Sequence, residues 1–342
     1  MAYTTINKST DYFNTKLYTG NGSTNAITGV GFQPDLLWFK NRNSAINHMW
    51  FDSVRGIDKY FYGNLNEAEG TSSSVLTAVG SDGFTVGANN NVNGSGNGIA
   101  SWNWKANGTG SANTQGDIAS TVSANTTSGF SIVSYTGTGS NATVGHGLGS
   151  APSMIIIKNR SVSSGFWRVY HSGLNSNNKN LKLNATNAEA TDSSIWNDTS
   201  PTNVNFSVGT SSDTNGSGNA MIAYCFAEKQ GYSKFGSYTG NGSADGTFVY
   251  TGFSPAFVIV KKTNGTDDWR MFDNKRPGFN VINDELKPNT SGSEGAGDKM
   301  DFLSNGIKFR VNSSVNASGT FIYMAFAEAP LVGTNNVPCT AR

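Results

Sequence analysis

One succession of motifs occurs three times along the chain, and this repetition limits what the chain can fold into. Each copy opens with a Tyr-Thr-Gly-x-Gly stretch, at residues 18–22, 135–139 and 238–242. A proline follows, and then a run of four apolar residues closed by a lysine: Lys40, Lys158 and Lys261. Short apolar runs bounded by turn residues are typical of strands that are buried on both faces. We therefore interpret the chain as three tandem copies of one unit.

Each copy closes with a strand in which large residues alternate with small or polar ones. The alternating pairs are Trp102 with Trp104, Tyr224 with Phe226, and Met324 with Phe326. Large residues at every second position share one face of a strand. No segment shows a helical period over a long stretch, and copies of roughly 100 residues are too long for propeller blades. The expected fold is all-β, with three tandem antiparallel β-sandwich domains of the jelly-roll type.

Composition changes along the chain predict the boundaries of these units. The predicted segments are a first sandwich at 1–107, a linker at 108–116, a second sandwich at 117–229, a third at 230–330 and a tail at 331–342. The stretch that joins the first two copies is polar and contains glycine, whereas the second copy runs directly into the third. We therefore expect the second and third sandwiches to pack rigidly and the first to have more freedom.

Charge and cysteine content argue against several classes of partner. The chain has 24 basic and 23 acidic residues and a formal net charge of +1, without a run of one sign. A nucleic-acid partner would require a basic patch, so none is expected. No apolar run is long enough to insert into a membrane. The two cysteines, Cys225 and Cys339, predict free thiols in a reducing compartment. The first residues do not show a basic segment followed by an apolar one, so no secretory signal is expected.

The residues that usually perform catalysis do not form a recurrent constellation. Acidic residues mostly fall at different places in each copy, and the histidines (His48, His146 and His171) lack the spacing of metal ligands. We predict no catalytic residue, no metal and no cofactor, and hence a protein that is not an enzyme. A glycan-degrading enzyme stays as a remote alternative, which would need two carboxylates across a groove.

A pattern of an aromatic residue, an aspartate and an arginine follows the buried strand in two of the copies. Its residues are Trp50, Asp52 and Arg55 in the first copy and Trp269, Asp273 and Arg276 in the third. In the second copy His171 replaces the aspartate and no arginine follows. One interpretation is a glycan-binding shelf, in which the ring stacks on a sugar and the charged pair bonds its hydroxyls. The alternative is an ion pair that pins a loop on a core aromatic residue.

One further tryptophan is a candidate for an exposed contact. Trp196 lies in a polar stretch between Ser194 and Asp198. A loop of this composition is expected at the surface. Trp196 therefore joins the six residues of the aromatic–aspartate–arginine patterns as a candidate ligand-binding residue.

Three stretches of the chain carry a resemblance to a known group of proteins. Residues 235–242, 255–261 and 325–330 resemble a repeat of uncharacterised virion surface proteins from marine and aquatic tailed bacteriophages. The resemblance covers about residues 13–330. It implies a virion structural protein of the tail-fibre or head-decoration type, assembled in the bacterial host cytoplasm, with other capsid or tail proteins as partners.

The chain lacks the heptads of a fibrous shaft, which favours a head decoration or a compact tail appendage over a long fibre. The alternative is a tail-fibre-like adhesin that binds a host-surface glycan. A homotrimer is a possible oligomeric state under either interpretation.

Overall fold

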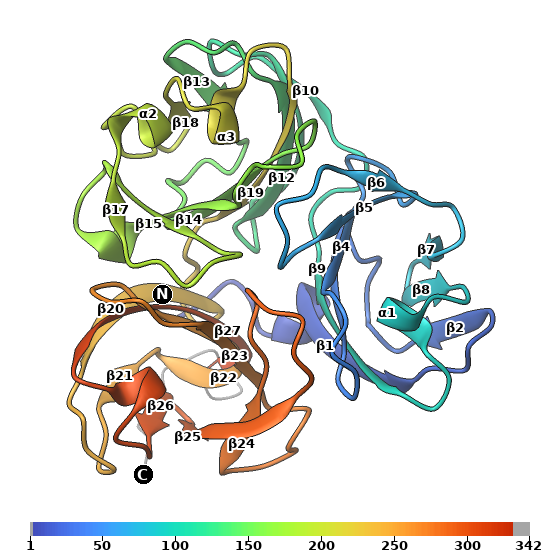
Figure 1. Ribbon diagram of the computed structural model, residues 1–342, viewed down its shortest axis with the longest axis vertical. Coiled ribbons are helices and arrows are strands. Elements are labelled where there is room, and N and C mark those ends of the chain that lie inside the picture. The colour runs from blue at the N-terminus through green and yellow to red at the C-terminus, as the bar shows by residue number, and fades with distance from the viewer. Residues whose placement is uncertain (1–2, 331–342) are drawn as a thin grey trace.

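The computed structural model describes residues 3–330, and this part of the chain is almost entirely β-structure (Figure 1). The expected all-β fold with antiparallel sheets is confirmed. Helical elements are single turns: η1 (Ser9–Asp11), α1 (Asn90–Asn93), η2 (Ser172–Leu174), α2 (Ser193–Trp196), α3 (Ser212–Asn215) and η3 (Ser314–Asn316). Within residues 3–330, no helix has the length and apolar character needed to cross a bilayer. The predicted tail at 331–342, with Cys339, lies outside the described residues.

The first copy folds into two antiparallel sheets. The larger sheet has the strand order β1-β9-β3-β4-β5-β6 and the smaller β2-β8-β7. The larger sheet contains β1 (Phe13–Thr19), β3 (Leu36–Asn41), β4 (Met49–Asp52), β5 (Lys59–Tyr62), β6 (Gly70–Thr71) and β9 (Gly98–Trp104). The smaller sheet contains β2 (Asn25–Thr28), β7 (Leu76–Gly80) and β8 (Gly83–Val86).

The second copy also forms a larger and a smaller sheet, with the orders β10-β11-β12-β19-β14-β15-β16-β17 and β13-β18. The larger sheet contains β10 (Ser111–Asn113), β11 (Ser120–Asn125), β12 (Phe130–Thr136), β14 (Met154–Asn159), β15 (Arg168–His171), β16 (Lys179–Lys182), β17 (Ala190–Thr191) and β19 (Ala220–Phe226). The smaller sheet contains β13 (Ala142–Gly145) and β18 (Asn205–Val208). Strand β10 lies within the segment predicted as a linker. Because it pairs with β11, this part of the segment belongs to the sheet of the second copy.

The third copy forms two four-stranded sheets, with the orders β20-β27-β22-β23 and β21-β26-β25-β24. The first of these contains β20 (Ser233–Gly240), β22 (Phe253–Lys262), β23 (Trp269–Asp273) and β27 (Gly319–Pro330). The second contains β21 (Phe248–Tyr250), β24 (Ile282–Glu285), β25 (Gly295–Leu303) and β26 (Gly306–Phe309).

All three copies share one four-strand arrangement, namely β1-β9-β3-β4, β12-β19-β14-β15 and β20-β27-β22-β23. The register is the same as well. Opposite each other lie Trp38 and Trp102, Ile156 and Tyr224, and Ile259 and Met324. A residue of one copy therefore has a defined structural equivalent in the other two.

The central strands β3, β14 and β22 are buried on both faces, as their apolar runs predict. Alternate residues of β14 show the two environments. Ile155 and Ile157 face a core within the second copy, whereas Ile156 faces a core that all three copies share. The other two copies likewise have one core each of their own.

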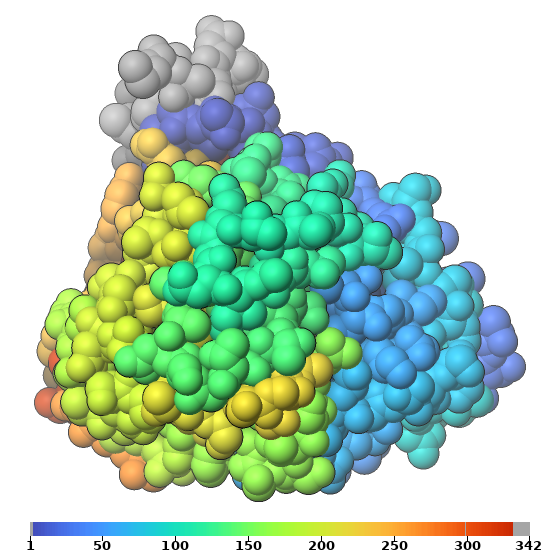
Figure 2. Space-filling model, turned by 90° about the horizontal axis from the view of Figure 1, so that it is seen from above, coloured from blue at the N-terminus to red at the C-terminus, as the bar shows by residue number. Residues whose placement is uncertain are grey.

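The shared core lies where the three copies meet (Figure 1). Equivalent aromatic rings from the three closing strands meet there, with centroid distances of 6.3 Å (Trp104–Phe226), 5.8 Å (Trp104–Phe326) and 6.1 Å (Phe226–Phe326). This triangle gives the chain an approximate threefold arrangement. The first copy thus packs against both of the others. The prediction that it has more freedom than they have is wrong. In the space-filling view the first and second copies, in blue and green, lie directly against each other (Figure 2).

The opening Tyr-Thr-Gly motif stabilises the fold of each copy. The tyrosine hydroxyl donates to a backbone carbonyl beside the last turn of the copy: Tyr18 to Val92 (2.5 Å), Tyr135 to Thr214 (2.5 Å) and Tyr238 to Val315 (2.6 Å). A fully buried asparagine follows each of these carbonyls and hydrogen-bonds back to the motif: Asn93, Asn215 and Asn316. The most recognisable motif of the repeat is therefore structural.

Candidate functional site

The seven residues predicted to contact a ligand all lie in the interior. They are Trp50, Asp52, Arg55, Trp196, Trp269, Asp273 and Arg276, and their exposed fractions run from 0 to 8%. A sugar could not stack on any of these rings in this structure. The glycan-shelf interpretation is therefore corrected. The contacts are those of an ion pair that holds a loop, the alternative considered from the sequence.

Trp196 is corrected for a local reason. Its polar neighbours form a one-turn helix, α2, which Asp192 caps by accepting from Ser194 N at 3.0 Å. The turn directs Trp196 inward, where its ring meets Tyr170 edge-on at 5.9 Å. The polar residues stay outside while the tryptophan fills the core of the second copy.

Asp52, at the end of β4, gathers donors from its own loop and from the second copy. Its Oδ1 accepts from the backbone N–H of Val54 (3.1 Å) and Arg55 (2.9 Å). Its Oδ2 accepts from Arg55 Nε at 2.5 Å and from the Tyr224 hydroxyl at 2.7 Å. The guanidinium carbon of Arg55 lies 4.1 Å from the ring centre of Phe61. The aspartate thus joins a loop of one copy to the closing strand of the next.

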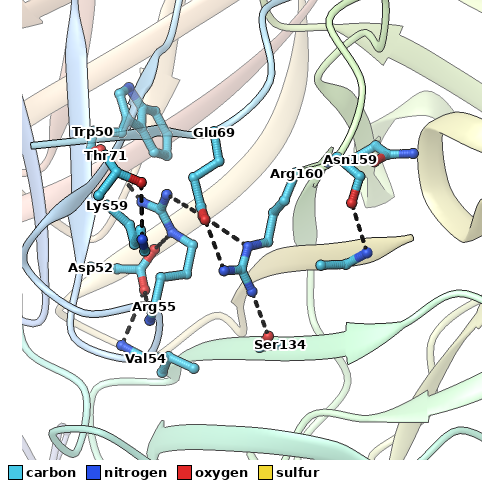
Figure 3. Close-up of polar contacts among 12 residues, drawn as sticks. Trp50, Asp52, Val54, Arg55, Lys59, Glu69, Thr71, Ser134, Asn159 and Arg160 are labelled. Carbon is cyan, nitrogen blue, oxygen red and sulfur yellow. Dashed lines mark hydrogen bonds and ion pairs between the residues drawn. The ribbon is translucent and has the colours of Figure 1, made fainter. Parts of the chain in front are cut away.

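Glu69 extends this network across the same boundary (Figure 3). It accepts from Arg55 Nη1 at 3.1 Å, and from Arg160 of the second copy through Nε at 2.8 Å and Nη2 at 3.0 Å. Its backbone N–H also donates to Arg160 O at 2.9 Å. Burial opposes the charge of Arg55, but the Asp52 and Glu69 carboxylates outweigh it and raise the pKa of Arg55. Two acids and two arginines leave the network without net charge.

The third copy contacts the first in the same way. Asp273 Oδ2 accepts from Arg276 Nε at 2.6 Å and from Trp102 Nε1 of the first copy at 3.0 Å. Glu294 accepts from Arg276 Nη1 at 2.9 Å and from Arg42 Nη2 of the first copy at 2.6 Å. Trp102 is the structural equivalent of Tyr224, so an indole replaces a phenol as the donor.

The boundary between the second and third copies lacks these ions. The equivalent of Asp52 is His171, whose Nδ1 accepts from Gly173 N at 3.0 Å. Its Nε2 therefore carries the proton and donates to Tyr323 O of the third copy at 3.0 Å. Burial lowers the pKa of His171 to about 4. The equivalent of Tyr224 is Met324, which has no donor to offer. The acceptor and its donor have thus changed together within one chain.

The second half of the network is also reduced at this boundary. Glu189 still donates its backbone N–H across it, to Thr263 O at 2.8 Å, as Glu69 does to Arg160. Thr263 occupies the position of Arg160 and Arg42 at the other two boundaries. Leu174 occupies the position of Arg55 and Arg276. The Glu189 carboxylate accepts from Lys179 of its own copy at 2.6 Å.

The lysine that closes each central strand makes one contact common to all three boundaries. Each ammonium donates to a carbonyl of the neighbouring copy: Lys40 to Ser291 (3.1 Å), Lys158 to Asn66 (2.8 Å) and Lys261 to Thr186 (3.2 Å). Burial lowers the pKa of each of the three to about 8. Sequence reasoning recognised these lysines only as strand ends. The sequence feature that could have indicated their burial is a lysine directly after four apolar residues of a buried strand.

Groups that could perform chemistry are few in the described part of the chain. Among these residues no three histidine, cysteine or acidic side chains gather as a metal would require. Cys225 is fully buried, and burial raises the pKa of its thiol. A neutral, enclosed thiol is a poor nucleophile.

Fold and contacts together define an all-β protein in which three copies of one unit close into a ring around a shared aromatic core. The chain belongs to the family described as Domain of unknown function (DUF7483), whose sequence profile matches residues 8–330. The match runs through all three copies, so the family's domain corresponds to the whole ring. No curated protein matches the chain.

Proposed function

We propose that this chain is a non-enzymatic structural protein displayed on the surface of a bacteriophage particle, as a head decoration or a compact tail appendage. It binds other virion proteins through its β-sandwich surfaces. The resemblance of residues 235–242, 255–261 and 325–330 to virion surface proteins supports the phage setting. The closed three-copy ring supports the structural role.

One observation carries the structural part of the proposal. Three charged residues of the first copy recur in the third: Asp52 as Asp273, Arg55 as Arg276 and Glu69 as Glu294. Each aspartate pairs with the arginine of its own copy and accepts a hydrogen bond from a side chain of the neighbouring copy. Each glutamate pairs with an arginine of the neighbouring copy. A charged side chain that is buried and already paired is not available to bind a substrate. The aspartates, arginines and glutamates of this network therefore hold the ring together. This arrangement fits a scaffold that binds its partners through its outer surfaces.

The proposal is tested on the phage whose genome encodes this chain. Mass spectrometry of purified particles should detect the chain, and a cryo-EM map should place it at regular positions on the head shell or at the tail periphery. A chain that stays in the lysate and is absent from purified particles would sink the proposal. Release of sugar from host polysaccharide by the purified chain would instead favour the enzyme alternative.

A further inference from the structure

A hollow of about 370 Å³ lies between the second and third copies, the boundary that lacks the ion network. The second copy contributes Leu174, Lys179 and Glu189 to its wall, and the third contributes Thr239, Thr263 and Thr320. Thr239 and Thr320 are exposed, so the hollow reaches solvent at that edge. It lies where η2 meets β20.

The other two boundaries show what fills the equivalent space. There, the carboxylate equivalent to Glu189 is held between two guanidinium groups: Glu69 between Arg55 and Arg160, and Glu294 between Arg276 and Arg42. Leu174 and Thr263 replace both arginines at the third boundary, and both line the hollow. The retained backbone bond from Glu189 to Thr263, at 2.8 Å, keeps the Glu189 backbone in the same relation to the neighbouring strand, and its side chain lines the hollow. The hollow is therefore an arginine site without its arginines.

Lys179 does not replace the lost guanidinium groups in kind. Its ammonium reaches only Oε1 of Glu189, and the two side chains are 32% and 22% exposed. An ion pair this close to water is weak, and a flexible lysine can turn out to solvent. A guanidinium presents a planar fork that bonds both oxygens of a carboxylate at once. Its remaining N–H groups would meet the hydroxyls of Thr239, Thr263 and Thr320, which can accept them.

We infer that this hollow binds one guanidinium group supplied from outside the chain, with Glu189 as its carboxylate partner. The group is carried either by an arginine side chain of a protein or by free arginine. This site goes beyond the structural role proposed above and does not depend on a phage setting. It would give the ring one distinct side among three similar ones.

The test is a titration of the full chain by calorimetry. The probes are Nα-acetyl-L-arginine amide, which presents the side chain as a polypeptide does, and free L-arginine. The expected dissociation constant is on the order of 1 mM for a single small group. Nα-acetyl-L-citrulline amide, which has nearly the same shape without the charge, and the corresponding lysine amide should bind at least tenfold more weakly.

Two variants tie the binding to the site. Glu189→Gln should weaken arginine binding by at least tenfold, whereas Glu67→Gln, at an exposed glutamate of the first copy, should leave it unchanged. Thr263→Arg should fill the hollow from within, abolish binding and raise the melting temperature, so the inference stays testable even if Glu189→Gln folds poorly.

The outcomes separate the sources and the failure. Binding of the capped amide points to a protein side chain, and binding of free arginine alone points to a small molecule. The inference is overturned if neither probe binds at about 10 mM, or if citrulline amide binds as well as arginine amide. It is also overturned if Thr263→Arg binds as the unaltered chain does.

Discussion

The boundary between the first and second copies and the boundary between the second and third solve the same packing problem with different chemistry. At the first, Asp52 forms an ion pair with Arg55 and accepts a hydrogen bond from the Tyr224 hydroxyl of the next copy. At the second, His171 is neutral and donates to a backbone carbonyl. The shared apolar core and the buried lysines are common to both. The difference lies only in the polar groups around that core, which shows that this layer can change while the ring stays closed.

The comparison also suggests why the charged version is retained at two of the three boundaries. A buried ion pair contributes little net stability against an apolar replacement, but a mismatched one costs a great deal. If the copies closed in the reverse order, Asp52 would face Met324, which has no donor, and His171 would face Trp102. The polar groups therefore specify which copy neighbours which, a role for which the apolar core alone is too uniform.

The largest expected effect comes from removing the acid at an ionic boundary. Asp52→Ala leaves Arg55 as a buried charge without its main partner and the Tyr224 hydroxyl without its acceptor. We expect the free energy of unfolding to fall by about 3–5 kcal/mol. His171→Ala removes neutral hydrogen bonds and a ring contact with Phe235 but leaves no buried charge unpaired, so it should cost less, about 1–3 kcal/mol. Urea denaturation measures both.

Asp11→Ala is the matched control for this pair of variants. Asp11 meets Lys8 at the surface, where both side chains are about half exposed or more, at 48% and 68%. Its removal should change stability by less than ~1 kcal/mol. If His171→Ala cost as much as Asp52→Ala, the ionic boundaries would not differ from the neutral one in the way proposed.

A smaller effect is expected one step outward, at the equivalent glutamates. Glu69→Gln removes the charge between Arg55 and Arg160 and should cost roughly 2–3 kcal/mol, because both arginines lose a charged acceptor. Glu189→Gln, at the boundary without arginines, should cost less than ~1 kcal/mol. The same denaturation series measures both, and equal losses would show that the hollow beside Glu189 does not make that boundary weaker.

Much of the fold was predictable from the sequence, because the signal was local. Four apolar residues in a row predict a strand such as β14 with two buried faces, and Tyr-Thr-Gly-x-Gly predicts a turn. What covers each face is not local. Ile155 faces its own copy and Ile156 faces the other two, and nothing in the pattern separates these environments. The ring closure could therefore not be predicted.

The prediction of a ligand-binding site was wrong for a related reason. An aspartate three residues before an arginine indicates that the two will pair, but it does not indicate the depth at which they pair. Depth depends on Tyr224 and Arg160 of another copy, which lie 172 residues from Asp52 and 91 residues from Glu69, their respective partners. Lys40 shows the same limit, since its place at the end of an apolar run does not indicate its depth, and this lysine is fully buried.

Acid should weaken the neutral boundary through His171. Its pKa is about 4 in the folded chain, against 6.5 as the ordinary value, because burial opposes the charged form. Between pH 6.5 and 4 the unfolded chain therefore binds more protons than the folded chain, and stability falls as the pH falls. The contribution is roughly 1 kcal/mol between pH 6.5 and 5.5. Melting curves of the unaltered chain and of His171→Asn should diverge in this range.

Burial also lowers the pKa values of His48 and His146. The pH dependence of stability of the unaltered chain therefore contains contributions from all three histidines. Only the difference between it and His171→Asn isolates the boundary. Parallel curves from pH 6.5 to 4 would mean that His171 takes up its proton in the folded state without cost, and the neutral description of this boundary would fail.

The smallest effect is expected at Lys179, and it decides whether the two kinds of boundary are truly different. If the lysine merely shields Glu189 at the surface, Lys179→Met should change the free energy of unfolding by less than ~1 kcal/mol, with little dependence on salt. If it has taken over the work of the two missing arginines, the loss should approach that of Glu69→Gln. Urea denaturation at low and high salt distinguishes these cases. The exposure of both side chains favours the first, because water competes for each of them and the arginine pairs at the other boundaries are more deeply buried.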